Sequence, residues 1–438
     1  MTARISTAQS PPLGLVAPFF LIAPLGLIAG GLLIASHDAA AFIAINHPHT
    51  VAITHAVILG WLTTTIMGAT YQLGPVVLGG QLLSVPLGRV HLILHAGSVA
   101  WFIWSLFYWE RLAMVGAATG LVISFLLYLV NAGTAVKRGN RWTLSRAYVA
   151  VALGFLVVTA AFGALWVGSH YEGWFVITPG KLSAHAHLGL VGWLAVMVMG
   201  VSYQLVPLFS VVNRAKPRFG WAALALTVGS LVLFAAVIFT DPPAALRVPA
   251  AMLLAAGPLL WAADILRLLR ARSRRKLDIQ GRATLLSLAF LALTAVLGVT
   301  AASGTPLVSD REPARLLLAY AAAGIFGFAG SPLIGNSYKV LPFLIWFHRY
   351  RVLVGHSPVP LVDDIYSSHA AHAVLGLHTL AVLTLIAAAL LGQLVLLQLG
   401  GVLLALGAAG HALSMVHMFL PKQASRQSTL KQAEVVLQ

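Results

Sequence analysis

Histidine is the residue type through which this chain could do metal chemistry. The sequence has sixteen histidines and no cysteine, which excludes thiolate metal sites, iron–sulfur clusters and disulfide bonds. Two of them, His55 and His187, each begin a long apolar segment, HAVILGWLTTTIMGATYQLGP and HLGLVGWLAVMVMGVSYQLVP. Neutral imidazole is a usual axial ligand of heme iron and also binds copper. These two residues are therefore candidate ligands for either group.

The two segments are copies of one pattern, and a third copy follows. Counted from His55, the pattern is Gly60, Trp61, Gly68, Tyr71 and Pro75. The same offsets from His187 give Gly192, Trp193, Gly200, Tyr203 and Pro207, and those from Ala322 give Gly327, Phe328, Gly335, Tyr338 and Pro342. The copies lie about four predicted helices apart. This spacing predicts three repeated four-helix units with approximate threefold symmetry about the membrane normal.

His55, His185 and His187 form the first candidate site. An ionisable residue inside a membrane helix is a functional-site hypothesis by default, because an unpaired polar group costs several kcal/mol in hydrocarbon. His185 lies two residues before His187, so the two side chains should point to different sides of the helix. We predict metal ligation at this site, near the outer membrane surface. The structural alternative is that each histidine bonds a neighbouring carbonyl group.

Small and aromatic residues follow these histidines. Gly60 and Gly192 lie about one turn further along, where they would leave room for the edge of a porphyrin. They would also let neighbouring helices approach closely. Trp61 and Trp193 would pack on the face of the porphyrin or anchor the helices, and the sequence does not rank these two roles.

A second group of histidines is predicted near the inner membrane surface. Its members open or end other apolar segments, and most are spaced three or four residues apart, which places each pair on one face of a helix. They could hold a second metal or heme, or they could simply be interfacial residues beside basic loops. The group comprises His91, His95, His369, His372, His378 and His411. His47 and His49 lie in a loop and form a weak candidate pair for metal capture.

The composition is that of an integral membrane protein. Of the 438 residues, 59% are hydrophobic and only 9% are charged, with a mean hydropathy of +0.91, whereas a soluble domain would have about 25% charged residues. The apolar segments are long enough for helices to cross about 30 Å of hydrocarbon. The first of them, from Pro12 to Ala35, is expected to be a membrane helix, because no cleavage pattern of a signal peptide follows it.

Twelve membrane helices are predicted, which makes the chain an all-α polytopic protein with one transmembrane domain over 1–438. The repeat cores fall near 51–79, 183–211 and 314–346. The other spans are expected near 13–35, 88–108, 111–133, 146–169, 218–240, 247–270, 283–302, 369–396 and 399–420, and 421–438 is a polar tail.

Basic residues predict the orientation. Lys and Arg lie in alternate connections, such as the loop around Lys137 and the loop from Arg267 to Arg282, whereas Ser36–Thr50 has none. By the positive-inside rule both termini and the tail are cytoplasmic, with the inner membrane of a bacterium as the expected location. The formal charge of +16 is explained in this way, so we expect no nucleic-acid partner.

The repeats resemble a known family. Twelve helices in three pseudo-repeats, with histidines on the second and sixth helices, resemble subunit I of the heme-copper oxidase superfamily, which includes the catalytic subunits of cytochrome c oxidases and nitric oxide reductases. The segment HAHLGLVGWLAVMVMG is also similar to a histidine-rich helix of the NnrS family of heme- and copper-associated membrane proteins. By resemblance, His55 would ligate a low-spin heme, and His187 or His185 would ligate copper or a non-heme iron.

Two departures from that family reduce the expected set of ligands. Ala322 stands where the third repeat would begin with histidine, and no histidine lies between Arg315 and Trp346. The seventh predicted helix, Phe219 to Thr240, lacks the histidine pair that the family uses for its second metal. The usual binuclear centre therefore cannot be assembled. Carboxylates are also scarce within the spans, so the sequence does not predict proton pumping.

Together these features predict a heme-binding redox protein. The heme would be of the b type, because there is no CxxCH attachment sequence, with copper as a further candidate. The expected work is electron transfer or oxygen or nitric oxide chemistry, as an oxidoreductase if catalytic, with a redox partner subunit or cytochrome supplying electrons. The alternative is a non-enzymatic transporter, or a factor that handles heme or copper.

Overall fold

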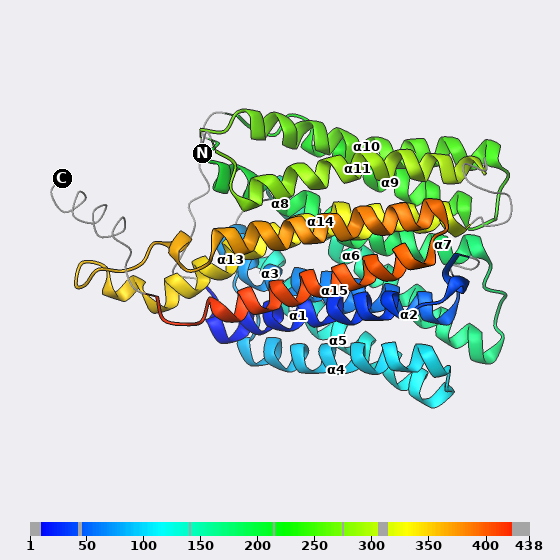
Figure 1. Cartoon of the computed structure of the whole chain (residues 1–438), viewed down its shortest axis with the longest axis horizontal. Helices are drawn as coiled ribbons and strands as arrows, with labels where there is room; N and C mark the ends of the chain where they lie inside the picture. The colour runs from blue at the N-terminus through cyan, green and yellow to red at the C-terminus, as the bar shows by residue number, and fades with distance from the viewer. Residues whose placement is uncertain are drawn as a thin grey trace.

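Twelve apolar helices run side by side along the long axis of the molecule (Figure 1). The structure is a computed structural model that describes residues 10–42, 46–139, 142–212, 215–273, 276–304 and 314–422. Within these ranges there is no β-strand. The prediction of an all-helical integral membrane protein with twelve candidate spans is confirmed. Most of the predicted tail, from residue 423 onward, lies outside the described residues.

Nine spans are single α-helices. Their apolar lengths and compositions suit a bilayer of about 30 Å. They are α1 (Leu13–Ala35), α4 (Val85–Tyr108), α5 (Arg111–Arg138), α6 (Leu144–Glu172), α9 (Gly220–Ile238), α10 (Ala244–Arg270), α11 (Ile279–Ser303), α14 (Ser368–Leu391) and α15 (Leu394–His417).

The other three spans carry the sequence pattern, and each contains a π-helical segment. The second runs through α2 (Pro48–His55), η3 (Ala56–Thr63), α3 (Thr64–Leu73) and η4 (Gly74–Leu78); the sixth through α7 (Pro179–His187), η5 (Leu188–Ala195) and α8 (Val196–Ser210); the tenth through α12 (Ala314–Ala321), η6 (Ala322–Gly330) and α13 (Ser331–Arg349). The π-helical segments begin directly after His55, directly after His187 and at Ala322. Such segments leave backbone carbonyl groups without their usual α-helical partner and are frequent at functional sites.

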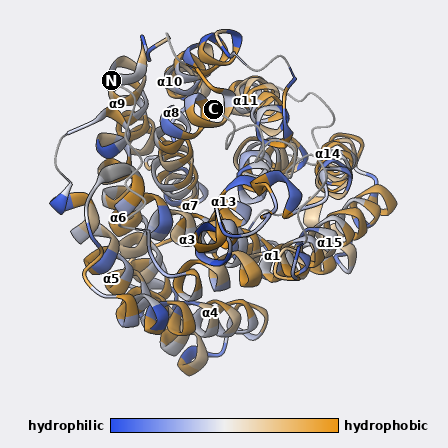
Figure 2. Cartoon of the chain, turned by 90° about the vertical axis from the view of Figure 1, so that its left-hand side faces the viewer, coloured by the Kyte–Doolittle hydropathy of each residue, from blue (hydrophilic) through white to orange (hydrophobic). Residues whose placement is uncertain are grey.

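These three spans form the centre of the bundle. In their most apolar stretches 61, 67 and 72% of residues are buried, against 22–50% in the other nine. The surrounding helices expose apolar side chains such as Ile93 and Leu413, and the end-on view in Figure 2 shows them mostly in the hydrophobic colour. That pattern suits contact with lipid rather than with water.

Close helix packing explains the glycines of the pattern. A Cβ atom at Gly60 would approach the backbone of Gly26 on α1 at 3.1 Å. At the equivalent Gly192 and Gly327 it would collide with Phe155 of α6 and Phe290 of α11. Glycine therefore lets each central span approach a neighbouring helix.

The first and last spans close the bundle. α1 packs along α15 over much of its length (Figure 1), and Gly31 of α1 lies against the backbone of Gly401 and Ala405. α1 begins and α15 ends at the same end of the bundle (Figure 1). We call this the terminal end, and we call the opposite end, where α2 and α7 lie, the His55 end.

Candidate histidine sites and the central cavity

His55 and His187 have the same local geometry. Nδ1 of His55 donates to the carbonyl of Val51 at 2.7 Å, and Nδ1 of His187 donates to the carbonyl of Ser183 at 2.8 Å. Each acceptor lies four residues earlier on the same helix, as expected for a histidine near the start of a span. A proton fixed on Nδ1 leaves the lone pair on Nε2, which is the form that ligates a metal.

Tyr320 is the residue of this site that the sequence did not single out. Its hydroxyl lies 3.0 Å from Nε2 of His187, to which it donates, and the two rings are nearly parallel with centroids 5.9 Å apart. Tyr320 lies two residues before Ala322, so it occupies the position of His185 in the second copy. Extending the alignment of the three copies toward the N-terminus by two residues would have placed Tyr320 in the same position as His185.

His185 points away from His187. It packs against α6, with Trp166 at 6.4 Å between ring centroids and Gly163 close by. Its Nδ1 is buried without a hydrogen-bond partner. His187 instead faces Phe234 of α9 and Tyr320 of α12, and His55 faces Phe102 of α4. The three histidines thus lie around the same level but point toward different helices.

Trp61 and Trp193 join the central spans to one another. Nε1 of Trp193 donates to the hydroxyl of Thr63 at 3.1 Å, which connects the sixth span to the second. Trp61 lies against Gly330 of the tenth span and is 1% exposed. Both rings are core residues in this structure and link neighbouring copies of the pattern.

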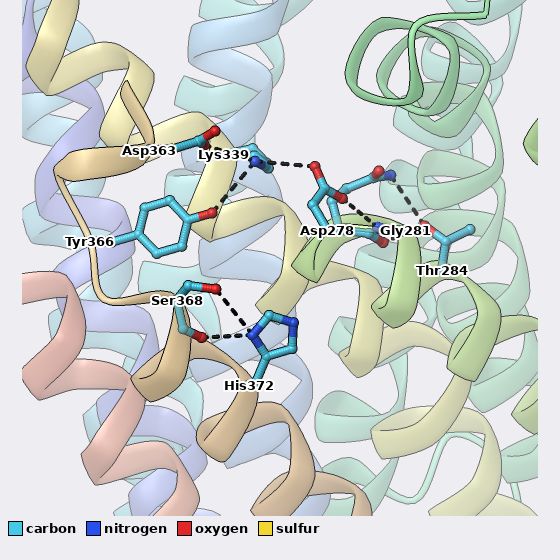
Figure 3. A network of polar contacts seen from close by, with 9 residues as sticks. Asp278, Gly281, Thr284, Lys339, Asp363, Tyr366, Ser368 and His372 are labelled. Carbon is cyan, nitrogen blue, oxygen red and sulfur yellow. Dashed lines mark hydrogen bonds and ion pairs between the residues drawn. The ribbon is translucent and has the colours of Figure 1, made fainter. Parts of the chain in front are cut away.

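The second group of histidines is divided among separate places. His91 and His95 lie on α4 with ring centroids 5.7 Å apart, whereas His378 lies on α14 and His411 on α15. All four are at most 6% exposed. His369 is exposed, and His372 binds its own helix through Ser368 (Figure 3). The group therefore forms two buried pairs and two residues at the start of α14.

Two of these histidines hold carbonyl groups of the π-helical segments. Nε2 of His95 lies 3.3 Å from the carbonyl of Leu59 in η3, and Nε2 of His378 lies 3.0 Å from that of Phe326 in η6. Leu59 and Phe326 are both four residues after the start of their copy of the pattern. A buried carbonyl without a partner is costly in a membrane. Stabilising the two interrupted helices is thus a structural role for His95 and His378.

The other two contact the tyrosines of the pattern or their neighbours. Nδ1 of His91 lies 3.1 Å from the hydroxyl of Tyr71. His411 contacts the hydroxyl of Ser337 at 3.2 Å, and its ring lies 5.3 Å from that of Tyr338. The two pairs of histidines therefore surround equivalent parts of the second and tenth spans.

A further histidine cluster lies in the loop at the His55 end. The rings of His37, His47 and His49 are 5.1–5.8 Å apart between centroids. His37 is 4% exposed, and Nε2 contacts Thr50. Burial lowers the pKa of His37, the nearby His47 and His49 lower it further, and Asp38 opposes this shift. His37 is therefore neutral at pH 7.

The donor atoms fit heme ligation better than a preformed metal centre. Within the described ranges no three side chains of His, Cys, Asp or Glu are arranged to hold one metal ion. Axial ligation of heme iron needs only one imidazole nitrogen on one face of the porphyrin. The fixed tautomer of His55 and of His187 leaves Nε2 free to be that nitrogen. Phe102 and Phe234 now lie against these imidazoles, so a porphyrin would have to displace them.

A cavity of about 70 Å³ lies between the three central spans and α11. Each central span lines it with residues at the same five offsets within the pattern: Thr65, Ile66, Ala69, Thr70 and Leu73; Met197, Val198, Val201, Ser202 and Leu205; Pro332, Leu333, Asn336, Ser337 and Val340. Among the described residues, no histidine and no charged residue lines it. The cavity therefore offers no imidazole of its own, although its Ser337 contacts His411 of the second histidine group.

An ion-pair network adjoins the cavity toward the terminal end (Figure 3). Lys339 of α13 is 6% exposed and pairs with Asp278 and Asp363, each at 3.1 Å. Nζ also lies 3.5 Å from the hydroxyl of Tyr366, whose pKa burial raises, so this phenol stays protonated. Asp278 caps α11 through the N–H of Gly281. Lys339, where the other copies have Gln72 and Gln204, thus ties three segments together.

The fold and sites define an all-helical integral membrane protein whose buried histidines gather around three interrupted central helices. No protein-family model matches the chain, and no curated protein matches its sequence.

Proposed function

We propose that the chain is a heme-binding redox protein of the membrane that carries electron transfer or oxygen or nitric oxide chemistry. His55 and His187 would hold a heme of the b type, with copper as a further candidate at His185. An active enzyme of this kind would be an oxidoreductase. The proposal includes a bacterial inner membrane with both termini cytoplasmic, and a redox partner subunit or cytochrome as electron donor.

The observation that carries the proposal is the matched hydrogen bond from Nδ1 of His55 and His187 to the carbonyl four residues earlier. Metal-ligating histidines almost always donate their other ring N–H to a carbonyl or carboxylate, which sets the tautomer and orients the ring. His372 makes the same bond to the carbonyl of Ser368, but it lies outside the three-copy pattern. Among the described residues Nε2 of His55 makes no hydrogen bond, and Nε2 of His187 only accepts from Tyr320.

The chain's own residues would hold and tune the group. A bound heme supplies one-electron redox chemistry. The carbonyl groups of Val51 and Ser183 increase the basicity of the two imidazoles. Tyr320 contributes a hydroxyl beside His187.

Three repeated units are part of the proposal. Two observations support them: the π-helical segments begin within one residue of the same position of the pattern, and the central cavity is lined at the same five offsets in each copy. Two copies begin with histidine and the third with Ala322. The reduced ligand set expected from the sequence thus follows from this third copy.

Optical spectroscopy tests the proposal. Reduced-minus-oxidised spectra of the purified protein, with a pyridine hemochrome assay and metal analysis, should show stoichiometric heme. His55→Ala and His187→Ala should each abolish or shift the heme bands because each removes an imidazole ligand. His348→Ala should leave them unchanged, since His348 lies at the terminal end, where it binds the carbonyl of Pro11 and packs on Phe347. Unchanged heme bands in both of the first two variants would refute this site.

The central cavity favours a second candidate function, that of a transporter. The alternative expected from the sequence, a factor that handles heme or copper, would use the histidines instead. Interrupted helices around a cavity deep in the bundle are typical of secondary transporters. A protein that purifies without heme or copper would support this candidate over the first.

A further inference from the structure

The wall of the central cavity offers more free hydrogen-bond acceptors than free donors, and its free donors are amide N–H groups of Asn336 and Gln280. At the fifteenth position after the start of each copy stands a hydroxyl residue: Thr70, Ser202 and Ser337. All three line the cavity. A hydroxyl has one proton and two lone pairs, so the destination of that proton decides what each residue can offer to a ligand.

Each of the three hydroxyls gives its proton to its own helix. Thr70 donates to the carbonyl of Ile66 at 2.7 Å. Ser202 donates to Met199 at 2.6 Å, and Ser337 donates to Ile334 at 2.7 Å. Only lone pairs then remain, and one of them is used outside the cavity at Ser202, by Trp261, and at Ser337, by His411. Each of these two oxygens keeps one lone pair for the cavity.

The other hydroxyl residues of the lining also donate their protons to backbone carbonyl groups. Thr65 donates to the carbonyl of Trp61 at 2.8 Å, and Thr284 donates to that of Gln280 at 2.9 Å. Ser287 donates to Phe328 at 2.7 Å. The indole N–H of Trp261 is also used, because it points to Ser202 and Met199.

Two amide oxygens in the wall have no partner. Gln280 is 1% exposed, and its amide nitrogen donates to Thr284 at 3.2 Å. Its Oε1 is buried without a hydrogen bond, as is Oδ1 of Asn336. Buried acceptors of this kind are normally satisfied by a bound molecule or by ordered water.

We propose that the central cavity binds a small molecule rich in N–H donors, of the amide or ammonium class. The volume of the cavity limits the size of the ligand. One water molecule needs about 10–15 Å³ of cavity volume, so about 70 Å³ holds a ligand of a few non-hydrogen atoms. Oxygen acceptors without a carboxylate suit an uncharged amide or a monovalent ammonium ion. This inference does not depend on heme binding at the His55 end.

Saturation-transfer NMR on the detergent-solubilised full chain tests the proposal with three methyl-bearing probes. Acetamide is an uncharged N–H donor, methylammonium is a charged one, and acetone has nearly the shape of acetamide without any donor. We expect acetamide or methylammonium to receive clearly more saturation than acetone, after subtraction of protein-free micelles. Stronger saturation of acetamide would indicate an uncharged ligand, and stronger saturation of methylammonium would indicate a cation.

Variants locate the binding. Ser202→Ala combined with Ser337→Ala should weaken binding of the preferred probe by about tenfold, because hydrogen bonds to two acceptors are lost. The matched control is Ser230→Ala, since Ser230 is 2% exposed and also donates to its own helix, but lies outside the cavity on α9. If the double variant is not monodisperse, the two single variants replace it, with a smaller loss expected from each.

Three outcomes would overturn the inference. Equal saturation of acetone and both donor probes would mean that the cavity makes no use of its acceptors. Absence of signal from both donor probes would mean that it holds water only. A signal that the Ser202 and Ser337 variants and Ser230→Ala leave equally unchanged would place the probe elsewhere.

Discussion

At the scale of single residues, the histidines divide according to what their ring nitrogens contact. His55 and His187 satisfy Nδ1 within their own helix, which leaves Nε2 suited to a ligand. His95 and His378 instead use Nε2 on carbonyl groups of other helices. The same residue type thus serves two purposes, and burial alone does not separate them, because His95 and His378 are the more buried pair.

His37 predicts a pH dependence at this scale. Its pKa is lowered chiefly by burial, so the unfolded chain binds a proton more readily than the folded protein does. The contribution of His37 to stability should therefore be full above about pH 6.5, the value for an unperturbed histidine, and should decline as the pH falls below it.

Comparing thermal unfolding of the wild type and His37→Gln between pH 7.5 and pH 5 measures this contribution. The wild type should lose more stability than the variant over this range, because glutamine does not titrate. The groups that face His37 are Asp38, His47 and His49, and all remain in the variant. Parallel loss of stability in the two proteins would contradict the assignment to His37.

At the scale of helices, the π-helical segments are the feature that organises the bundle. They interrupt the second, sixth and tenth spans at matching positions, and in the second and tenth a histidine from α4 or α14 satisfies a carbonyl of the segment. In the sixth span the carbonyl of Val191, four residues after His187, instead accepts from the backbone N–H of Val196. Interrupted helices are tolerated in membranes only where neighbouring groups satisfy the freed backbone.

His378→Leu tests the role of such a contact. The change leaves the carbonyl of Phe326 without its donor in a buried position, which should cost about 1–3 kcal/mol of stability. His378→Gln keeps an N–H donor and should cost less. The midpoint of thermal unfolding measures both.

His372→Leu is the control for this prediction. His372 lies on the same helix, but its Nδ1 reaches only Ser368 one turn earlier. The His372→Leu variant should shift the midpoint of thermal unfolding little. A shift as large as that of His378→Leu would mean that the loss reflects a histidine on α14 in general and not the carbonyl of η6.

At the scale of the whole molecule, packing and charge close the bundle at the terminal end. α1 and α15 join the first and last spans, and Lys339 joins α13 to the start of α11 and to the loop that carries Asp363. Breaking a buried ion pair by removing one partner is strongly destabilising, because the other charge remains. The side chain of Asp363 is 63% exposed, so losing its ion pair with Lys339 costs little stability.

We therefore expect Lys339→Met to destabilise the protein by about 1–3 kcal/mol, mainly through Asp278. Adding Asp278→Asn should restore part of the loss, since asparagine removes the stranded charge and still caps a helix well. Thermal unfolding of the two variants and of Asp278→Asn alone completes the comparison. An additive effect of the two changes would show that Lys339 and Asp278 are not coupled.

Much of the architecture could be predicted from the sequence. The apolar lengths gave twelve spans, because a helix must cross the hydrocarbon with every backbone group satisfied internally. The largest differences are about five residues each: α5 continues to Arg138 rather than 133, and α14 ends at Leu391 rather than 396, where Gly392 has a φ of +64°. α15 accordingly begins at Leu394 rather than near 399. The second span begins at Pro48 rather than near residue 51, because proline suits the first turn of a helix.

The sequence by itself determined that this is a membrane protein of twelve helices, and it singled out the histidines and the three-copy pattern, because composition, length and spacing along one chain carry that information. Only the tertiary structure decided which groups meet: Tyr320 with His187, His95 and His378 with the carbonyls of Leu59 and Phe326, and three hydroxyls around one cavity. These contacts join helices far apart in the chain. They depend on which spans are neighbours and how each is rotated, and neither property follows from hydropathy, because lipid and protein surroundings are equally apolar.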